Sequence, residues 1–311
     1  MSRIYEALQR ADLERKTATI PEIEPMLDTE PIAPEIEELA PSALPTSPQA
    51  PPAPPALVYT EEVVHRPWRP AVAALPTLED RGAGVEQFRA LRSRVYQARY
   101  EAPLKTILIC SGLPSEGKSF VTANLTMTMA RNSVNSILLI DGDLRRPSQH
   151  TLLGASNEIG LSDYLAGTAE LKDIMQRDSS PKKASSTTVG SVANLTFIAA
   201  GKCGDNSAEL VSNHRMEQLI ATVAPHFDWI LIDSPPVLAV TDAVELSHAA
   251  DAVLLIARGA STPYEVAQQT QAAFSKSRIL GFVLNDVKEA PAHGYGYYDY
   301  YGAPQTPSRT K

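Results

Sequence analysis

Cysteine and long apolar runs are both scarce in this 311-residue chain, which has two cysteines and only strand-sized apolar stretches. Two cysteines are too few for a disulfide framework, and Cys110 ends an apolar run, so we expect a reducing cytoplasmic setting. No stretch approaches the roughly 20 apolar residues of a membrane-spanning helix. The N-terminus also lacks the apolar core of a signal peptide. The sequence therefore predicts a soluble protein that meets a membrane only through a partner.

Basic residues are too few to favour a nucleic-acid partner, because 28 lysines and arginines face 36 acids and the formal net charge is −8. Most of the acidic excess lies between Thr17 and Pro76, which holds fourteen of the 25 prolines and nine acids against Arg66 and Arg69. This stretch has few large apolar side chains to offset the entropy of ordering it. We expect an acidic, disordered, polyproline-like linker.

The distribution of proline and charge divides the chain into four predicted parts. These are a short amphipathic helix at 1–16, the Pro-rich linker at 17–83, a folded domain at 84–288 and a disordered, tyrosine-rich tail at 289–311. A helix as short as the first is marginal in water by itself, so we expect it to be frayed or docked on a partner. The third part is long enough to bury a hydrophobic core.

Apolar runs of strand length recur through the folded part and alternate with helical patterns. The predicted strands are 106–110, 136–140, 195–199, 229–232, 252–257 and 279–284; helical patterns cover 121–131, 208–223, 242–248 and 263–274, and a further helix precedes Pro103. Continuous apolar strands that alternate with helices are typical of a parallel sheet covered on both faces. The fold class is therefore α/β, with a doubly wound, mostly parallel sheet, which the loop at 112–119 described next assigns to the P-loop NTPase kind. The stretch 178–191 is predicted as a surface loop.

A phosphate-binding loop follows the first of these strands. The sequence Gly112-Leu113-Pro114-Ser115-Glu116-Gly117-Lys118-Ser119 matches the pattern G-x-x-x-x-G-K-[ST]. Because the loop leads from a strand into a helix, backbone N–H groups and the helix N-terminus can cradle phosphate oxygens. We expect Lys118 to neutralise the β- and γ-phosphates of ATP, and the Ser119 hydroxyl to bind Mg²⁺.

Two other predicted strands end in carboxylates. Asp141 and Asp143 follow the strand at 136–140, and Asp233 follows the strand at 229–232. An acid after a strand is often only a helix cap. Ligands of an open parallel sheet, however, bind at the carboxyl ends of its strands. Three such acids beside the phosphate-binding loop therefore favour a nucleotide site over three separate caps.

Five tyrosines crowd into ten residues near the end of the chain. They are Tyr295, Tyr297, Tyr298, Tyr300 and Tyr301. No apolar periodicity runs through them, so a packed core does not account for them. The alternatives are a disordered interaction tail and a set of phosphate acceptors, and the phosphate chemistry upstream favours the second.

These motifs make the chain similar to the bacterial tyrosine autokinases of the CpsD/CapB type, the cytoplasmic kinases of capsule and exopolysaccharide export systems. The resemblance covers about residues 85–301. It rests on the loop with Pro114, on apolar triplets followed by Asp141-x-Asp143-x-Arg145 and by Asp233-x-Pro235-Pro236, on the helix motif E-x-x-R-x-x-R formed by Glu86, Arg89 and Arg92, and on the tyrosine cluster.

The resemblance implies a role for each motif. The nucleotide set is Gly112, Pro114, Ser115, Glu116, Gly117, Lys118, Ser119, Phe120, Arg145 and Asn285. Ser119 would bind Mg²⁺ directly, and Asp143 and Asp233 would bind it directly or through water. The catalytic set is Asp141, Asp143 and Lys118. Asp141 is our choice for the base that accepts the tyrosine proton, although sequence does not separate its role from that of Asp143. Arg145 either contacts phosphate or closes its loop. Asn285 either bonds adenine or ends its strand.

The resemblance also implies partners. Glu86, Arg89 and Arg92 would contact the next subunit of a homo-oligomeric ring, in which tail tyrosines are phosphorylated in trans; the alternative is a solvated charged face. The expected location is the cytoplasm, at the inner face of the membrane, through a separate membrane adaptor that activates the kinase. Tyrosine residues of other proteins are further expected substrates.

Two readings compete with the kinase. One is an ATPase switch of the Min/Par type, but those proteins carry a signature lysine where this chain has Leu113, and they lack a tyrosine-rich tail. The other is a nucleotide-binding scaffold with vestigial chemistry, against which the intact Lys118, Ser119 and Asp233 argue. The chain also departs from its relatives at 205–210, where they often read Pro-Asn-Pro, so that loop is expected to be less rigid.

Overall fold

The computed structural model describes residues 63–79, 81–131, 134–179, 194–202 and 206–287. The predicted helix at 1–16, most of the predicted linker and the whole tyrosine cluster lie outside these residues. None of the helices among the described residues is both long enough and apolar enough to cross a membrane.

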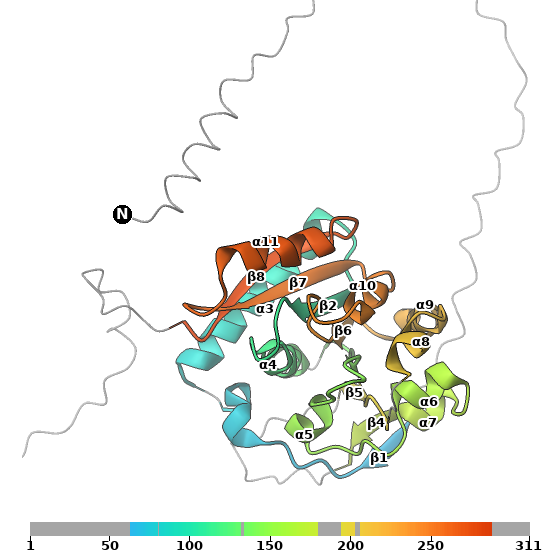
Figure 1. Cartoon of the computed structure of the whole chain (residues 1–311). Helices are drawn as coiled ribbons and strands as arrows, with labels where there is room; N and C mark the ends of the chain where they lie inside the picture. Colours follow the sequence, from blue (N-terminus) through green and yellow to red (C-terminus); the bar gives the residue numbers. More distant parts are fainter. Residues whose placement is uncertain (1–62, 80, 132–133, 180–193, 203–205, 288–311) are drawn as a thin grey trace, which may run out of the picture. The chain divides into compact units, whose positions relative to one another are not determined.

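An eight-stranded sheet forms the centre of the domain. Its strands are β1 (Val64–Arg66), β2 (Thr106–Ser111), β3 (Ile137–Asp141), β4 (Met175–Asp178), β5 (Leu195–Ile198), β6 (Trp229–Asp233), β7 (Ala252–Arg258) and β8 (Ile279–Asn285). They lie in the order β1-β4-β5-β3-β6-β2-β7-β8 (Figure 1). Every neighbouring pair is parallel except β4 and β5. The predicted mostly parallel sheet is confirmed, as are all six predicted strands.

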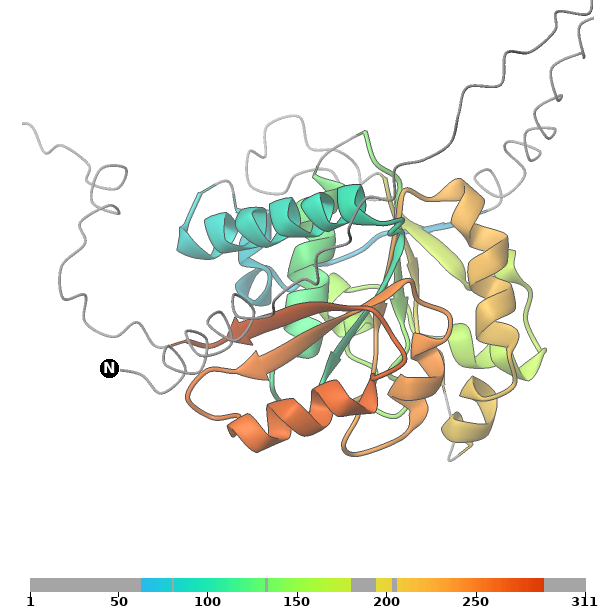
Figure 2. The same ribbon diagram turned by 90° about the horizontal axis from the view of Figure 1, so that it is seen from above.

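Helices cover both faces of the sheet. They are η1 (Val72–Ala74), η2 (Pro76–Leu78), α3 (Ala83–Glu101), α4 (Lys118–Ala130), α5 (Gln149–Leu153), α6 (Leu161–Ala166), α7 (Leu171–Ile174), α8 (Ser207–Val211), α9 (Arg215–Val223), η3 (Ala224–His226), α10 (Asp242–Ser247) and α11 (Tyr264–Ala273). Figure 2 shows α3 and α11 on opposite sides of the sheet. This is the doubly wound arrangement that the alternating pattern predicts.

The alternation of side chains along β3 divides the core in two. Leu138 and Ile140 pack on one face with residues of α6 and α9. Ile137 and Leu139 pack on the other face with residues of α3 and α4. Because both faces are buried, the strand is apolar throughout, which explains why its sequence is a continuous run rather than an alternation.

The predicted start of the folded domain at residue 84 is too late. Residues 63–78, which we assigned to the linker, supply β1 and two short helices, and Trp68, Leu75 and Leu78 are buried. The Trp68 ring packs edge-on against Phe197, with the ring centroids 6.1 Å apart. The apolar side chains at the end of this Pro-rich stretch are therefore enough to hold it on the domain.

One predicted helix is divided in two. The pattern at 208–223 forms α8 and α9, separated at residues 212–214. His214 has the positive φ of 59°, and the Asn213 side chain accepts a hydrogen bond from the Arg215 N–H. Local side-chain hydrogen bonding of this kind competes with the helix and ends it.

Candidate functional site

The phosphate-binding loop joins β2 to α4 at the carboxyl edge of the sheet. Gly117 has a φ of +93°, which favours glycine, and Lys118 begins the helix. The N–H groups of the first turn of α4 therefore face the loop, as phosphate binding requires. β2 lies between β6 and β7, so the loop is next to the end of β6.

The register of the sheet brings two of the predicted carboxylates side by side. Asp141 ends β3 and Asp233 ends β6, and the two are direct partners in the parallel pairing. Beyond them, the Gly142 N–H donates to the Asp233 carbonyl oxygen at 2.8 Å. Partners in one register project their side chains to the same face. Both carboxylates are fully buried.

Lys118 reaches the carboxylates of two other segments. Its Nζ lies 2.8 Å from Asp143 Oδ2 and 3.9 Å from Asp233 Oδ1, and 3.2 Å from the Ser119 Oγ. Burial is the largest influence on the pKa of Lys118 and lowers it, but the charges of Asp233, Asp143 and Asp141 outweigh it. The net result is a pKa above the ordinary value, so the ammonium stays charged.

Asp141 is bound through one of its oxygens only. Its Oδ2 accepts hydrogen bonds from the N–H groups of Ser148 and Gln149, each 3.0 Å long, while Oδ1 is buried without a hydrogen-bond partner. Burial raises the pKa of Asp141 to about 8, and the charge of Asp233 acts in the same direction. Burial likewise raises the pKa of Asp233, although Lys118 opposes that shift. Burial among neighbouring carboxyl groups thus favours the protonated form of Asp141.

The structure adds one residue that the sequence motifs do not identify. Gln149 is fully buried, and its Nε2 donates to Asp233 Oδ2 at 2.8 Å and to the Ser119 carbonyl oxygen at 3.0 Å. No motif marks this glutamine, since it stands alone after the loop that follows β3. The only available signal is a polar residue at the start of a short helix.

Two predicted nucleotide-binding residues, Asn285 and Glu116, form hydrogen bonds that stabilise the phosphate-binding loop. Asn285 donates from Nδ2 to the Glu116 carbonyl oxygen at 3.0 Å. The Glu116 carboxylate accepts a hydrogen bond of 2.8 Å from the Leu113 N–H and contacts the Thr262 hydroxyl beyond β7. Glu116 thus links the start of the loop to its end, and it is held by β8 and by the turn after β7.

Four other predicted nucleotide-binding residues differ in their contacts. Arg145 forms a two-pronged ion pair with the buried Asp242 of α10, with distances of 2.9 and 3.2 Å. The ring of Phe120 packs edge-on against Phe88 of α3, with the centroids 5.9 Å apart. Pro114 and Ser115 are exposed at the tip of the loop, where Ser115 has a φ of 66°.

The helix motif of α3 makes contacts within its own chain. Arg89 forms an ion pair with Glu86 one turn away. Arg92 donates to the Thr128 carbonyl oxygen of α4 at 2.9 Å. With Arg131, the two arginines line a depression of about 390 Å³. The predicted contact with another subunit is not tested by these contacts, and neither are the five tail tyrosines, which lie outside the described residues.

The protein groups fit a magnesium ion only together with phosphate. Within the described part of the chain, no group of three or more histidine, cysteine or acidic side chains is arranged to hold a metal. Ser119, Asp143 and Asp233 instead supply one hydroxyl and two carboxylates around Lys118. Mg²⁺ typically takes one or two carboxylates and completes its shell with water and substrate phosphates. The donor set therefore suits a magnesium–nucleotide complex.

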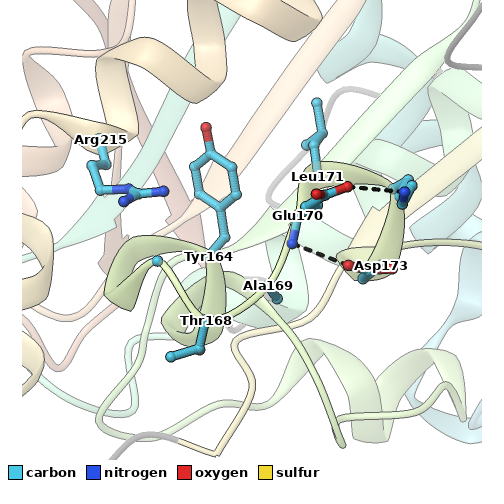
Figure 3. Close-up of a pocket in the computed structure, with 9 residues that line it drawn as sticks. Tyr164, Thr168, Ala169, Glu170, Leu171, Asp173 and Arg215 are labelled. Atoms are coloured by element: carbon cyan, nitrogen blue, oxygen red, sulfur yellow. Dashed lines mark hydrogen bonds and ion pairs between the residues drawn. The ribbon is translucent and has the colours of Figure 1, made fainter.

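A second depression, of about 750 Å³, lies between α6, α7 and α9. Figure 3 shows Tyr164 standing between Arg215 on one side and Leu171 on the other. The Arg215 guanidinium carbon is 5.1 Å from the centre of the Tyr164 ring. None of its lining residues belongs to the predicted nucleotide-binding, metal-binding or catalytic set, so we do not assign phosphoryl transfer to this depression.

No protein-family model matches the chain. The chain is 31% identical over 222 residues to the tyrosine-protein kinase YwqD of Bacillus subtilis, an alignment that covers 71% of this chain and 88% of the relative. It is 34% identical over 217 residues to the tyrosine-protein kinase etk of Escherichia coli (strain K12), which covers 69% of this chain and 28% of that relative. The chain thus spans less than a third of the longer relative.

A solved structure is similar as well. The kinase domain of the Escherichia coli tyrosine kinase ETK has a TM-score of 0.58 and 33% sequence identity, and the match covers 68% of this chain and 80% of that one. Fold and sequence therefore agree on the same group of proteins.

Proposed function

The chain belongs to the bacterial protein-tyrosine kinases, and on that premise we propose that it transfers the γ-phosphoryl group of ATP to the tyrosines of its own C-terminal cluster. The observation that carries this proposal is the convergence of Lys118 with Asp143 and Asp233, which come from three separate segments. Phosphoryl transfer depends mainly on such positioning and charge neutralisation. The acceptors we propose are Tyr295, Tyr297, Tyr298, Tyr300 and Tyr301.

Each part of the site has a proposed task. Lys118 and the N–H groups of the loop bind the phosphates, and Ser119, Asp143 and Asp233 hold Mg²⁺ directly or through water. When bound, the ion neutralises charge on the phosphates. The ammonium of Lys118 must then exchange part of its contact with Asp143 for phosphate oxygens.

Asp141 is the proposed base. Its unpartnered Oδ1 is the carboxylate oxygen available for a proton, because Oδ2 is held by two backbone N–H groups. Asp143 is less suited, because Arg146 N–H donates to one of its oxygens and Lys118 to the other. The tyrosine hydroxyl, with an ordinary pKa near 10, loses its proton as the new P–O bond forms. Since Asp141 is fully buried, the loop after β3 has to open for the hydroxyl to reach it.

Transfer between subunits is the proposed arrangement. Ten residues separate Asn285 from Tyr295, a reach of at most about 35 Å when extended, enough to enter a neighbouring site. Glu86, Arg89 and Arg92 are proposed to contact that neighbour in a ring. Each phosphate adds about −1.5 to −2 of charge, so several phosphorylated tails would repel one another and dissociate the ring. A membrane adaptor that recruits and activates the kinase in polysaccharide export completes the proposal.

Mass spectrometry of phosphotyrosine tests the proposal directly. Purified protein is incubated with ATP and Mg²⁺, alongside Lys118→Met and a truncation before Gly294. We expect label on the tail of the unaltered protein and none in Lys118→Met. Tyr264→Phe is the matched control, because Tyr264 is an exposed tyrosine outside the tail and its loss should leave the labelling unchanged. Hydrolysis of ATP without phosphotyrosine, with an adaptor segment also present, would instead indicate an ATPase switch.

A mixing experiment tests the direction of transfer. Lys118→Met protein keeps its tail but not its lysine, whereas the truncated protein keeps its site but no acceptors. Label on the Lys118→Met chain in the mixture, and in neither protein alone, is the expected result. Absence of label in the mixture, when the unaltered protein labels itself, contradicts transfer in trans.

A further inference from the structure

Gln149 connects all three segments that form the site. Its backbone N–H donates to Asp141 Oδ2, and its side-chain Nε2 donates both to Asp233 Oδ2 and to the carbonyl oxygen of Ser119. One residue thus contacts the end of β3, the end of β6 and the first turn of α4.

The orientation of the Gln149 amide follows from its neighbours. Both groups near Nε2, a carboxylate and a carbonyl, are acceptors only, so the amide must present its N–H₂ to them. Asp233 Oδ2 is consequently held by Gln149. The opposite oxygen, Oδ1, faces Lys118 at 3.9 Å and the Thr122 hydroxyl at 3.4 Å.

Packing by itself does not account for a glutamine here. The side chain is fully buried, and its Oε1 has no hydrogen-bond partner. A buried acceptor without a partner costs roughly 1–3 kcal/mol. Methionine or leucine would fill a similar volume without that cost. The amide is therefore present for its two donor contacts.

We propose that Gln149 is a positioning residue of the kinase, which fixes the carboxylate of Asp233 and the first turn of α4 so that Asp233 and Ser119 bind the same magnesium ion. The inference rests on the proposed function in one respect, the assignment of Asp233 and Ser119 to the metal. Residues that orient metal ligands typically change metal affinity or activity by 10–100-fold when they are replaced.

Nucleotide binding with and without metal tests the proposal. The affinity of a fluorescent ADP analogue is measured in excess Mg²⁺ and in EDTA. In Gln149→Met we expect the dissociation constant in Mg²⁺ to rise about 10-fold or more, while the value in EDTA stays within about twofold. The N–H groups that bind phosphate remain held by the backbone of α4, whereas the metal ligands Asp233 and Ser119 lose the amide that orients them. A purely structural role would weaken both values alike.

Gln176→Met is the matched control. Gln176 is a second buried glutamine, whose amide exchanges two hydrogen bonds with the backbone of Ser156, outside the nucleotide site. Its replacement should leave the effect of Mg²⁺ on ADP binding unchanged. Gln149→Asn keeps the amide on a shorter side chain that cannot span both acceptors. In this variant, as in Gln149→Met, Mg²⁺ should strengthen ADP binding less than it does in the unaltered protein. Gln149→Asn also replaces Gln149→Met if that variant does not fold.

The outcomes separate this inference from the proposed function. If Mg²⁺ strengthens ADP binding equally in the unaltered protein and in the Gln149 variants, Gln149 does not position the metal ligands. If Mg²⁺ has no effect in the unaltered protein, the metal site is wrong and this inference is wrong with it. Because the assay needs no phosphate transfer, a failure to label the tail leaves its result intact.

Discussion

The Asn285 side-chain amide, at the end of β8, donates a 3.0 Å hydrogen bond to the Glu116 carbonyl oxygen in the phosphate-binding loop. The contact places the amide directly against Gly117, where an added Cβ would lie 1.9 Å from Asn285 Nδ2. The loop is therefore shaped by the last strand of the sheet as well as by its own glycines.

Gly117→Ala tests this contact. Gly117 combines the clash with a φ of +93°, whereas Gly281 has a φ of +139° and open space around it. We expect Gly117→Ala to lower the free energy of unfolding by about 1–3 kcal/mol, and by more than Gly281→Ala. Adding Asn285→Ala should restore part of the loss by removing the clash. Equal losses in the two glycine variants, measured by urea denaturation, would refute the close approach.

Arg145→Ala is predicted to destabilise the protein by about 1 kcal/mol, a value reduced because the arginine is partly exposed. In this variant the Asp242 carboxylate, which is 2% exposed, stays buried without the guanidinium that pairs with it. The double variant Arg145→Ala/Asp242→Asn should recover stability in urea denaturation. If tail phosphorylation recovers with it, Arg145 only closes its loop; if phosphorylation stays low, Arg145 also acts on the nucleotide.

Asp141→Asn should stabilise the protein in EDTA while it removes the proposed base. Burial raises the pKa of this carboxyl group from 3.8 to about 8, so the folded protein loses stability as the pH rises between those values. The asparagine has no such loss, so its advantage in melting temperature should widen from pH 5 to pH 8, by roughly 2–4 °C per kcal/mol. Phosphotyrosine formation should fall by about 100-fold or more.

Asp251→Asn is the control for that series. Asp251 is exposed and also accepts two backbone N–H groups, from Lys105 and Thr106. Because Asp251 is exposed, it has no burial cost of the kind that acts on Asp141, so its replacement should not raise the melting temperature. A constant gap for Asp141→Asn would show that the buried carboxylates do not oppose folding.

The Cys110 thiol is predicted to be unreactive in the folded protein. It is fully buried, and burial raises its pKa from 9.0 to about 12. The thiolate that reacts with alkylating agents is therefore absent at pH 8.5. In Cys203→Ser protein, iodoacetamide should modify Cys110 only after urea is added, as measured by intact mass. Because the pKa is raised, stability from this group is lost only above about pH 9. Rapid labelling of folded protein would contradict the prediction.

The sequence predicts the central strands because each is a continuous apolar run, buried on both faces. It misses β1 and β4 for the opposite reason. β4 reads Met-Gln-Arg-Asp and β1 reads Val-His-Arg, so neither shows an apolar pattern. Their strand conformation depends on pairing with each other and with β5, a tertiary contact that no local propensity encodes.

The candidate site was predictable as far as its motifs extend. Lys118, Asp143 and Asp233 lie close together, because each follows a strand that ends at the same edge of the sheet. The contacts of Gln149 and Asn285 were not predictable, because each depends on how a side chain from a distant segment is oriented. Asn285 was expected to bond adenine or to end its strand; that it also holds the phosphate-binding loop follows only from three-dimensional packing.

Three buried carboxylates, Asp141, Asp143 and Asp233, surround the single ammonium of Lys118. The burial and mutual repulsion of these carboxylates at the carboxyl edge of the sheet oppose folding, and a bound divalent cation would offset that cost. If Mg²⁺ binds where we propose, removing the ion should lower the free energy of unfolding as well as the rate of tyrosine phosphorylation.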